Sequence, residues 1–339
     1  MEAVAAELSM LAERHGWMRP WQLETVYCGG GTPSLLGPAS MARLRDRLSE
    51  VVYWDESAEW TCEANPESFS SVTAREWRAA GVNRISLGAQ TFSEPVLRWM
   101  GRLHGPDGPA AAVAAARSAG IENVSVDLIF GLPRRLGRDW TADLARLEAL
   151  APEHVSLYGL TAEPATTLGS RVREGKEVLA DESEYAVEYL EAVATLECWG
   201  YTAYEVSNFA RPGRESRHNQ AYWEGRAYLG LGPAAHSSLP PERWWNVREW
   251  TDYRQRVHAG LDLVAGREVV DGDAALLETL WLGLRQRGGV ELAGLSGPQR
   301  ALAATWRDQG WARHEPARLR LTPEGWLRLD ALTVALAAA

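Results

Sequence analysis

The sequence predicts an α/β protein: a partial (βα) barrel at residues 1–240, followed by a small, mainly helical domain at residues 241–339. In the first two-thirds, short apolar or β-branched runs alternate with stretches of helical periodicity, which is typical of parallel βα units. Polar or glycine residues follow each predicted strand, where barrel proteins bind their ligands. After about Val264 the alternation ends and helical stretches dominate.

The composition narrows the class of protein and of partner. The 339 residues are 46% hydrophobic and 24% charged, which is ordinary for a globular protein with a large core. The net charge of −10 disfavours binding to a nucleic-acid phosphate backbone. The sequence contains no signal peptide, and no apolar run approaches the ~20 residues of a membrane span. We therefore expect a cytoplasmic protein that has no transmembrane segment and binds small molecules.

Five strands are predicted in the barrel region, each a short apolar or β-branched run bounded by turn residues. They are Glu24–Gly29, Glu59–Ala64, Arg84–Ala89, Asn123–Phe130 and His154–Leu160. Because helical stretches separate them, we expect the strands to be parallel and their carboxyl ends to lie at one end of the barrel.

The chain begins with a helix and not with a strand. Leu8 and Leu11 share one face of this helix, which ends at Gly16. In a βα barrel a strand precedes such a helix. Without that strand, Glu24–Gly29 would have an uncovered edge, which proteins normally avoid. We therefore expect a partial barrel that lacks its first strand, and a further segment in front of Met1.

Capping signals predict the later helices of the barrel region. Thr73 with Glu76 predicts a capping box for a helix that ends at Gly81. Asp181 begins a long helix that ends at Gly200. Both helices end at a glycine because glycine readily adopts the left-handed conformation that stops a helix.

The C-terminal third follows a different pattern. Helices are predicted at Asp273–Arg287 and Gln299–Gln309, and a short strand at Arg318–Thr322. Helices closed by a short strand indicate a small helical or winged-helix-like domain. Because this domain lacks a basic recognition helix for DNA, we interpret it as a cap or as a surface for a partner.

Candidate ligand-binding residues lie at the ends of the predicted strands. The first strand continues into the GGGTP turn at residues 29–33, whose bare main chain suits a carboxylate or the polar end of an amino acid. Glu63, Gln90 and Asp127 lie at the ends of three other strands, so they would meet at one end of the barrel. The alternatives are a plain tight turn and caps for the following helices.

Five motifs follow one another along the chain: YCGGGTPS, EANP, GVNRISLGAQTF, DLIFGLP and HVSLYGL. In this order they resemble the oxygen-independent coproporphyrinogen oxidase-like group of the radical S-adenosylmethionine (SAM) superfamily. The resemblance runs from about Thr25 into the C-terminal domain and implies a SAM-binding barrel followed by the C-terminal domain of that group. The SAM site that it implies consists of Gly30, Gly31, Thr32, Glu63, Gln90, Arg102 and Asp127.

A second cluster distinguishes the branches of this group. His218, Asn219, Tyr222 and Trp223 form an HNxxYW motif, which resembles the HemW branch of haem chaperones more than the oxidases. That resemblance implies haem as cargo, an acceptor protein, and action near the cytoplasmic face of the membrane. His218 or His236 would bind the iron, with the tyrosine and tryptophan against the macrocycle. The alternative is that these side chains only bond the loop and fill the core.

The chain does not contain the cluster ligands of that superfamily. Its members hold a [4Fe-4S] cluster through a CxxxCxxC loop, whereas Cys28, Cys62 and Cys198 are too far apart in sequence to form one. We interpret Cys28 and Cys62 as small buried hydrophobic residues on adjacent strands. Apart from the haem candidates, no metal ligands are therefore predicted within this chain, since the cluster cysteines are absent from it.

Three functions stay open. The first is a haem chaperone of the HemW type, dependent on SAM and a cluster in the full-length family. The second is oxygen-independent oxidation of coproporphyrinogen III in porphyrin biosynthesis, against which the HNxxYW motif argues. The third is a cluster-free relative that binds SAM or haem. Whether the protein is an enzyme stays open too, since the chaperone branch lacks the oxidase activity.

Overall fold

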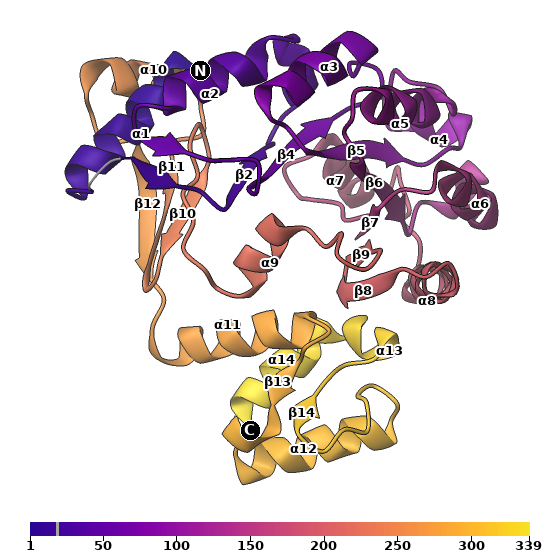
Figure 1. Cartoon of the computed structure of the whole chain (residues 1–339). Coiled ribbons are helices and arrows are strands. Elements are labelled where there is room, and N and C mark those ends of the chain that lie inside the picture. Colours follow the sequence, from indigo (N-terminus) through magenta and orange to yellow (C-terminus); the bar gives the residue numbers. More distant parts are fainter. Residues whose placement is uncertain (18–19) are drawn as a thin grey trace.

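The computed structural model describes residues 1–17 and 20–339 (Figure 1). Within these residues the largest sheet has seven strands, in the order β2-β4-β5-β6-β7-β9-β8, and it curls into a half-barrel. Its strands are β2 (Thr25–Cys28), β4 (Glu59–Ala64), β5 (Arg84–Gln90), β6 (Asn123–Phe130), β7 (His154–Gly159), β8 (Thr202–Glu205) and β9 (Asn208–Ala210). The predicted α/β half-barrel is therefore confirmed.

The first five strands of this sheet are parallel, as the sequence predicts. All five lie within one residue of their expected bounds. The last two strands differ, because β9 runs antiparallel to β7 and β8 runs antiparallel to β9. β2 forms one edge of the sheet.

Helices cover the outer face of the half-barrel (Figure 1). They are α2 (Ser40–Leu48), α3 (Ser71–Ala80), α5 (Gly108–Ser118), α6 (Trp140–Leu150) and α8 (Glu182–Cys198). Outward strand residues such as Trp60, Ile85 and Val126 are buried in the main core together with Trp77 of α3. Apolar and polar residues alternate along the strands, so the opposite face of the sheet is polar.

The predicted start of the helix at Asp181 is confirmed, whereas the capping box predicted at Thr73 is wrong. Asp181 caps α8, and its partner in the box is Glu184. At α3 the capping residue is Ser70, whose Oγ accepts a hydrogen bond from the N–H of Thr73. Ser70 has the extended backbone of a cap, and the helix begins directly after it, so Thr73 already lies in the first turn.

A second, antiparallel sheet was not predicted from the sequence. It comprises β10 (His236–Leu239), β11 (Glu242–Asn246) and β12 (Val264–Val269). Its hydrophobic pattern is weak because β12 is largely exposed. The boundary expected at residues 240/241 falls in the turn between β10 and β11, and the division of the chain into domains stays a prediction.

Two helices join this sheet to the barrel. They are α1 (Glu2–Arg14), which packs against α2, and α10 (Trp250–Ala259), which packs against α1. The buried Glu7 of α1 accepts hydrogen bonds from Gly232 N, Asn246 Nδ2 and Tyr253 Oη at 2.5–2.7 Å. Burial raises the pKa of Glu7, and these three donors oppose the rise.

The C-terminal region is mainly helical, as the sequence predicts. It comprises α11 (Gly272–Arg285), β13 (Val290–Glu291), α12 (Gly297–Asp308), β14 (Arg318–Leu319), α13 (Pro323–Trp326) and α14 (Leu329–Ala338). The predicted strand at Arg318–Thr322 is reduced to the two residues of β14, which pair with β13. The final helix, α14, packs against α11 and was not predicted.

Short elements complete the chain. They are β1 (Trp21–Gln22), β3 (Val52–Tyr53), α4 (Glu94–Trp99), α7 (Thr167–Arg173), α9 (Arg217–Trp223) and the 3-10 turns Pro33–Leu36, Arg134–Leu136 and Leu292–Gly294. α9 lies between the barrel and the C-terminal helices, where it packs against β2 and α11 (Figure 1). Among the described residues, no helix is both long and apolar enough to cross a membrane.

Candidate functional site

Polar side chains line the inner face of the half-barrel. Residues in register on neighbouring strands form two rows across it, because the strands are parallel and their side chains alternate between the faces. The rows are Tyr27, Thr61, Arg84 and Asn123, and then Glu63, Ser86, Ser125 and His154. Such a polar lining is suited to binding a charged ligand and is not a second hydrophobic core.

The glycine turn is held by Glu63. Its Oε1 accepts a hydrogen bond from the hydroxyl of Tyr27 at 2.7 Å, and its Oε2 accepts one from the N–H of Gly30 at 3.2 Å. A Cβ on Gly29 would lie 2.6 Å from the Tyr27 ring and 2.7 Å from the Glu63 carboxyl, so only glycine fits there. Gly31 faces open space, which leaves the outer side of the turn accessible.

Asn65 connects two further predicted residues. Its Nδ2 donates to Thr32 Oγ1 at 3.3 Å, and its Oδ1 accepts a hydrogen bond from Arg102 Nη1 at 3.0 Å. Gly88 leaves room for Gln90, because a Cβ there would lie 2.8 Å from Gln90 Nε2 and 3.4 Å from Asn65 Oδ1. Thr32, Gln90 and Arg102 are thus brought together around Asn65.

Gln90 has a strained backbone that its neighbours hold in place. Its φ of 67° lies in the left-handed region, which is unusual for a residue other than glycine. The next two residues are fixed by the buried Asp143, which accepts hydrogen bonds from Thr91 Oγ1 at 2.6 Å and from Phe92 N at 2.8 Å. Burial raises the pKa of Asp143, and these bonds together with Arg138 oppose the rise.

Asp127 lies one residue pair beyond the second polar row. Its carboxylate accepts hydrogen bonds from Ser86 Oγ at 3.0 and 3.1 Å and from Ser125 Oγ at 3.1 Å. Burial raises the pKa of Asp127, while the serine hydroxyls and the nearby Arg84 lower it. Asp127 therefore joins Glu63 and Gln90 on the inner face of neighbouring strands.

The HNxxYW segment is docked onto the barrel by Glu59. This buried carboxylate accepts hydrogen bonds from Ser216 Oγ, Arg217 N and His218 N at 3.0–3.3 Å. It therefore lies at the N-terminus of α9, where the unpaired N–H groups and the helix dipole favour a negative charge. The docking places His218 beside β2, the edge strand of the half-barrel.

The His218 ring is engaged on both nitrogens. Nδ1 is 2.8 Å from Thr25 Oγ1, and Nε2 is 2.9 Å from the hydroxyl of Tyr222. The ring also stacks on Tyr27, with 5.0 Å between centroids and 18° between planes. Burial, aided by Arg84 and opposed by Glu59, lowers the pKa of His218 to about 4, so its imidazole is neutral at pH 7.

The other two aromatic candidates lie apart from His218. Trp223 faces α11, with the guanidinium carbon of Arg285 4.0 Å from its ring centroid and the Trp281 centroid at 6.3 Å. His236 is exposed on β10 and stacks on Trp245 at 5.7 Å. Within the described part of the chain, no hydrogen bond or ring contact joins His236 to His218.

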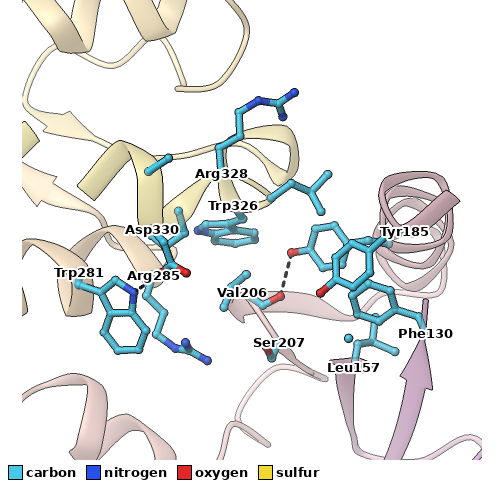
Figure 2. A pocket seen from close by; sticks show the side chains of 15 residues that line it. Phe130, Leu157, Tyr185, Val206, Ser207, Trp281, Arg285, Trp326, Arg328 and Asp330 are labelled. Carbon is cyan, nitrogen blue, oxygen red and sulfur yellow. Dashed lines mark hydrogen bonds between the residues drawn. The ribbon is translucent and has the colours of Figure 1, made fainter. Parts of the chain in front are cut away.

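A pocket of about 450 Å³ lies where β6, β7 and α8 meet the C-terminal helices (Figure 2). Its walls include the aromatic residues Phe130, Tyr185, Tyr189, Trp281 and Trp326, together with Arg285 and Arg328. Arg285 forms a 2.7 Å ion pair with the fully buried Glu205, so its charge is already compensated. The same guanidinium lies over the rings of Trp223 and Trp281, which makes the pocket a neighbour of the end of α9.

Most of the candidate SAM residues lie close together at the end of the half-barrel where the glycine turn lies. At this end of the half-barrel, Glu63 is bonded to Gly30, and Asn65 is bonded to both Thr32 and Arg102, with Gln90 close by. Residues that were not predicted as site residues hold both candidate sites in place: Tyr27, Asn65 and Asp143 at the SAM candidates, and Thr25 and Glu59 at His218. Two of these have a signal in the sequence, since Tyr27 begins the YCGGGTPS motif and Asn65 lies in EANP.

The thiols do not fit a [4Fe-4S] cluster. Cys28 and Cys62 are direct neighbours across β2 and β4, Cys62 Sγ lies 3.4 Å from the sulfur of Met41, and Cys198 is on α8. In residues 1–17 and 20–339, no group of three histidine, cysteine or acidic side chains is arranged to hold a metal ion. We therefore derive no reaction step through a cluster.

Known proteins resemble this chain in sequence and in fold. The radical SAM superfamily matches residues 4–146. The haem chaperone HemW of Mycobacterium tuberculosis is 38% identical over 331 residues, 97% of this chain and 84% of that protein. HemW of Bacillus subtilis is 33% identical over 276 residues, 79% and 71% of the two chains. The coproporphyrinogen III oxidase HemN of Escherichia coli shares the fold, with a TM-score of 0.81 and 22% identity over 98% of this chain and 82% of its own.

The half-barrel, the glycine turn and the superfamily match define a radical SAM protein. Within this superfamily, the chain is 33–38% identical to the two HemW proteins over most of its length. The chain belongs to the HemW family, and the resemblance found in its motifs is confirmed. The roles of the individual site residues stay predictions.

Proposed function

We propose that this protein binds haem and transfers it to an acceptor protein. The observation that carries the proposal is the half-buried, neutral imidazole of His218, held next to Tyr222 at the edge of the half-barrel. Iron binds the neutral form of imidazole, so a lowered pKa favours ligation at pH 7. Relatives that match most of this chain are named haem chaperones, which supports the same function.

The contacts of His218 indicate how the ring would meet iron. Nε2 would bind the metal after Tyr222 releases it, and Nδ1–H would donate to Thr25 Oγ1. A second partner of this kind orients a ligating histidine and fixes its tautomer. His236 is the alternative ligand, since it is exposed and stacks only on Trp245.

SAM fits the end of the barrel at which the glycine turn lies. Glu63 would pair with the ammonium of its methionine part, Gly30, Gly31 and Thr32 offer backbone and hydroxyl groups, and Gln90 and Asp127 supply polar contacts nearby. In radical SAM proteins, SAM is the source of an adenosyl radical when a cluster reduces it. Because the thiols here do not fit a cluster, the proposal for this chain is limited to SAM binding.

The oxidase alternative has less support. The likeness to the coproporphyrinogen oxidase HemN is at 22% identity and concerns the fold alone. The HNxxYW segment, which contacts Glu59 and Thr25, resembles the chaperone branch more than the oxidases. We further propose that delivery occurs in the cytoplasm, at or near the membrane face, to an acceptor not yet identified.

A haem titration tests the proposal. Purified protein is titrated with haemin, and the Soret absorbance gives the dissociation constant for the native chain and for His218→Ala, His236→Ala and His258→Ala. We expect one haem per chain and at least a tenfold loss of affinity in His218→Ala. His258 is exposed on α10 and outside the candidate site, so its variant is the matched control.

Transfer is measured by mixing the haem-loaded protein with a haem-free globin as an artificial acceptor. Delivery of haem faster than its spontaneous dissociation into buffer is the expected result. Loss of affinity only in His236→Ala would move the site to β10. Equal weak binding by all four proteins would refute the function.

A further inference from the structure

Tyr27 is in contact with both candidate sites at once. Its hydroxyl donates to Glu63 at 2.7 Å, and Glu63 in turn accepts from the N–H of Gly30 in the glycine turn. Its ring stacks on the imidazole of His218, with 5.0 Å between centroids. One side chain therefore joins the turn expected to bind SAM to the imidazole expected to bind haem.

The surroundings of Tyr27 leave it little freedom. On one side, Gly29 allows the ring and the Glu63 carboxyl to approach to distances that any Cβ would block. Burial and the Glu63 carboxylate raise the pKa of Tyr27, so the hydroxyl stays protonated and always donates. A change at Glu63 must therefore alter the contacts of Tyr27, because among the described residues its hydroxyl has no second hydrogen-bond partner.

β2 strengthens the connection between the two sites. Thr25 and Tyr27 are two residues apart on this strand, so both side chains lie on the same face, and both contact His218. The glycine turn begins directly after the strand ends at Cys28. A shift of the turn is thus transmitted to His218 by one short, continuous segment of backbone as well as by the tyrosine ring.

The charged groups around His218 do not provide another route. The two charges that act on its pKa are those of Glu59, which raises it, and Arg84, which lowers it. Neither contacts the glycine turn through a hydrogen bond or ion pair in the described residues, and the Glu63 charge is not among the causes of the shift. The contacts that join Glu63 to His218 therefore run through Tyr27 and β2.

We propose that Tyr27 is a positioning residue that couples the glycine turn to the His218 ring, so that a ligand ammonium bound at Glu63 changes haem affinity at His218. The ligand half of this statement rests on the proposed function, whereas the coupling of Glu63 to His218 does not. Linkage makes the effect reciprocal: SAM alters haem affinity by the same factor by which haem alters SAM affinity. Couplings of this kind are typically about 5- to 150-fold.

The first experiment needs no ligand. In protein with labelled histidine rings, NMR titration gives the pKa of His218, assigned from the resonance lost in His218→Gln. The charge of Glu63 is removed by Glu63→Gln, in the native background and in Tyr27→Phe. Phenylalanine keeps the ring on His218 and removes only the hydroxyl. The matched control is Tyr201→Phe, which removes a buried hydroxyl that is bonded to Pro152 O and not to a residue of either site.

We expect Glu63→Gln to change the pKa of His218 by about 0.4 unit or more in the native and Tyr201→Phe backgrounds. This change corresponds to about 0.5 kcal/mol, the smallest interaction energy that is typical of groups in one hydrogen-bond network. In Tyr27→Phe the change should vanish. An equal change in all three backgrounds, or none in the native protein, would overturn the coupling. If the variants fail to fold, the His218 resonance of the native chain with and without SAM provides the same test.

The second experiment adds the ligands. The haem dissociation constant is measured with and without saturating SAM in the native chain, Tyr27→Phe and Tyr201→Phe. We expect the two dissociation constants, with and without SAM, to differ by about fivefold or more in the native chain and in Tyr201→Phe. In Tyr27→Phe they should be nearly equal. A native ratio of one overturns the coupling between ligands. Absence of haem binding in every protein is instead a failure of the proposed function, and the NMR result then decides the role of Tyr27 independently.

Discussion

The burial of His218 makes the free energy of unfolding depend on pH in a way that can be calculated. The pKa of the ring is about 4 in the folded protein, chiefly because burial disfavours the imidazolium, against 6.5 in the unfolded chain. Between these values the unfolded chain binds more protons than the folded one, so stability rises with pH. The stabilisation that the neutral ring contributes to the free energy of unfolding is complete above about pH 6.5, and it is lost as the pH falls through about 4.

We predict that His218→Gln removes part of this pH dependence. From pH 7.5 to pH 5.0 the shift of one ring corresponds to about 2 kcal/mol of lost stability, so the native protein should lose about that much more than the variant. Urea-induced unfolding followed by tryptophan fluorescence at the two pH values measures the difference. The variant is also expected to be less stable at pH 7.5, because it loses the hydrogen bonds to Thr25 and Tyr222.

The comparison isolates His218 because other shifted groups are present in both proteins. His154, whose pKa burial holds well below its usual value, acts in the same direction. Buried acids such as Asp127 and Asp143, with raised pKa values, act in the opposite direction. His258→Gln, at an exposed position, is the control and should keep the native slope. Equal slopes for His218→Gln and the native protein would refute the assignment of a buried neutral ring.

Three further predictions concern stability and follow from single contacts, each measured by urea unfolding at pH 7.5. Asp143→Ala removes the acceptor that fixes the segment after Gln90 and should cost about 3 kcal/mol; a loss below about 1 kcal/mol would show that the buried bonds are not needed. Asp181→Ala removes the cap of α8 and should cost about 1 kcal/mol. Gly29→Ala forces the turn away from Glu63 at a cost of about 2 kcal/mol, whereas the control Gly31→Ala, facing open space, should be nearly neutral.

The barrel strands could be predicted from the sequence because local rules and tertiary structure agree there. Each strand is buried on its outer face, as Trp60 and Val126 illustrate, and ends at, or directly before, a polar or glycine residue. β11 and β12 escaped prediction because β11 has two charged residues followed by two tryptophans, without the alternation of a half-buried strand, and β12 is mostly exposed. Ser70 escaped because two serine or threonine residues three apart each offer a plausible cap, and only the backbone conformation decides between them.

The positioning residues of the candidate site could not be predicted from spacing alone. Tyr27 and Thr61 are ordinary strand residues in sequence, and only the register of β2 with β4 places them in the same row. Glu59 and His218 are 159 positions apart, so the sequence gives no sign that one carboxylate caps the helix of the other. Motifs indicate which side chains meet a ligand, whereas contacts that hold those side chains depend on pairing between distant segments.

The contacts of His218 have a consequence for a protein that must release its cargo. Both ring nitrogens already have partners in the absence of haem, so the imidazole is not left as a costly unpaired polar group in a half-buried place. Binding iron through Nε2 exchanges the bond to Tyr222 for a metal bond, and loss of iron restores it. Since a net hydrogen bond is worth about 1 kcal/mol, this exchange lowers the affinity by roughly fivefold without removing the ligand. Under the proposed function, the same tyrosine that completes the HNxxYW motif therefore favours transfer over retention.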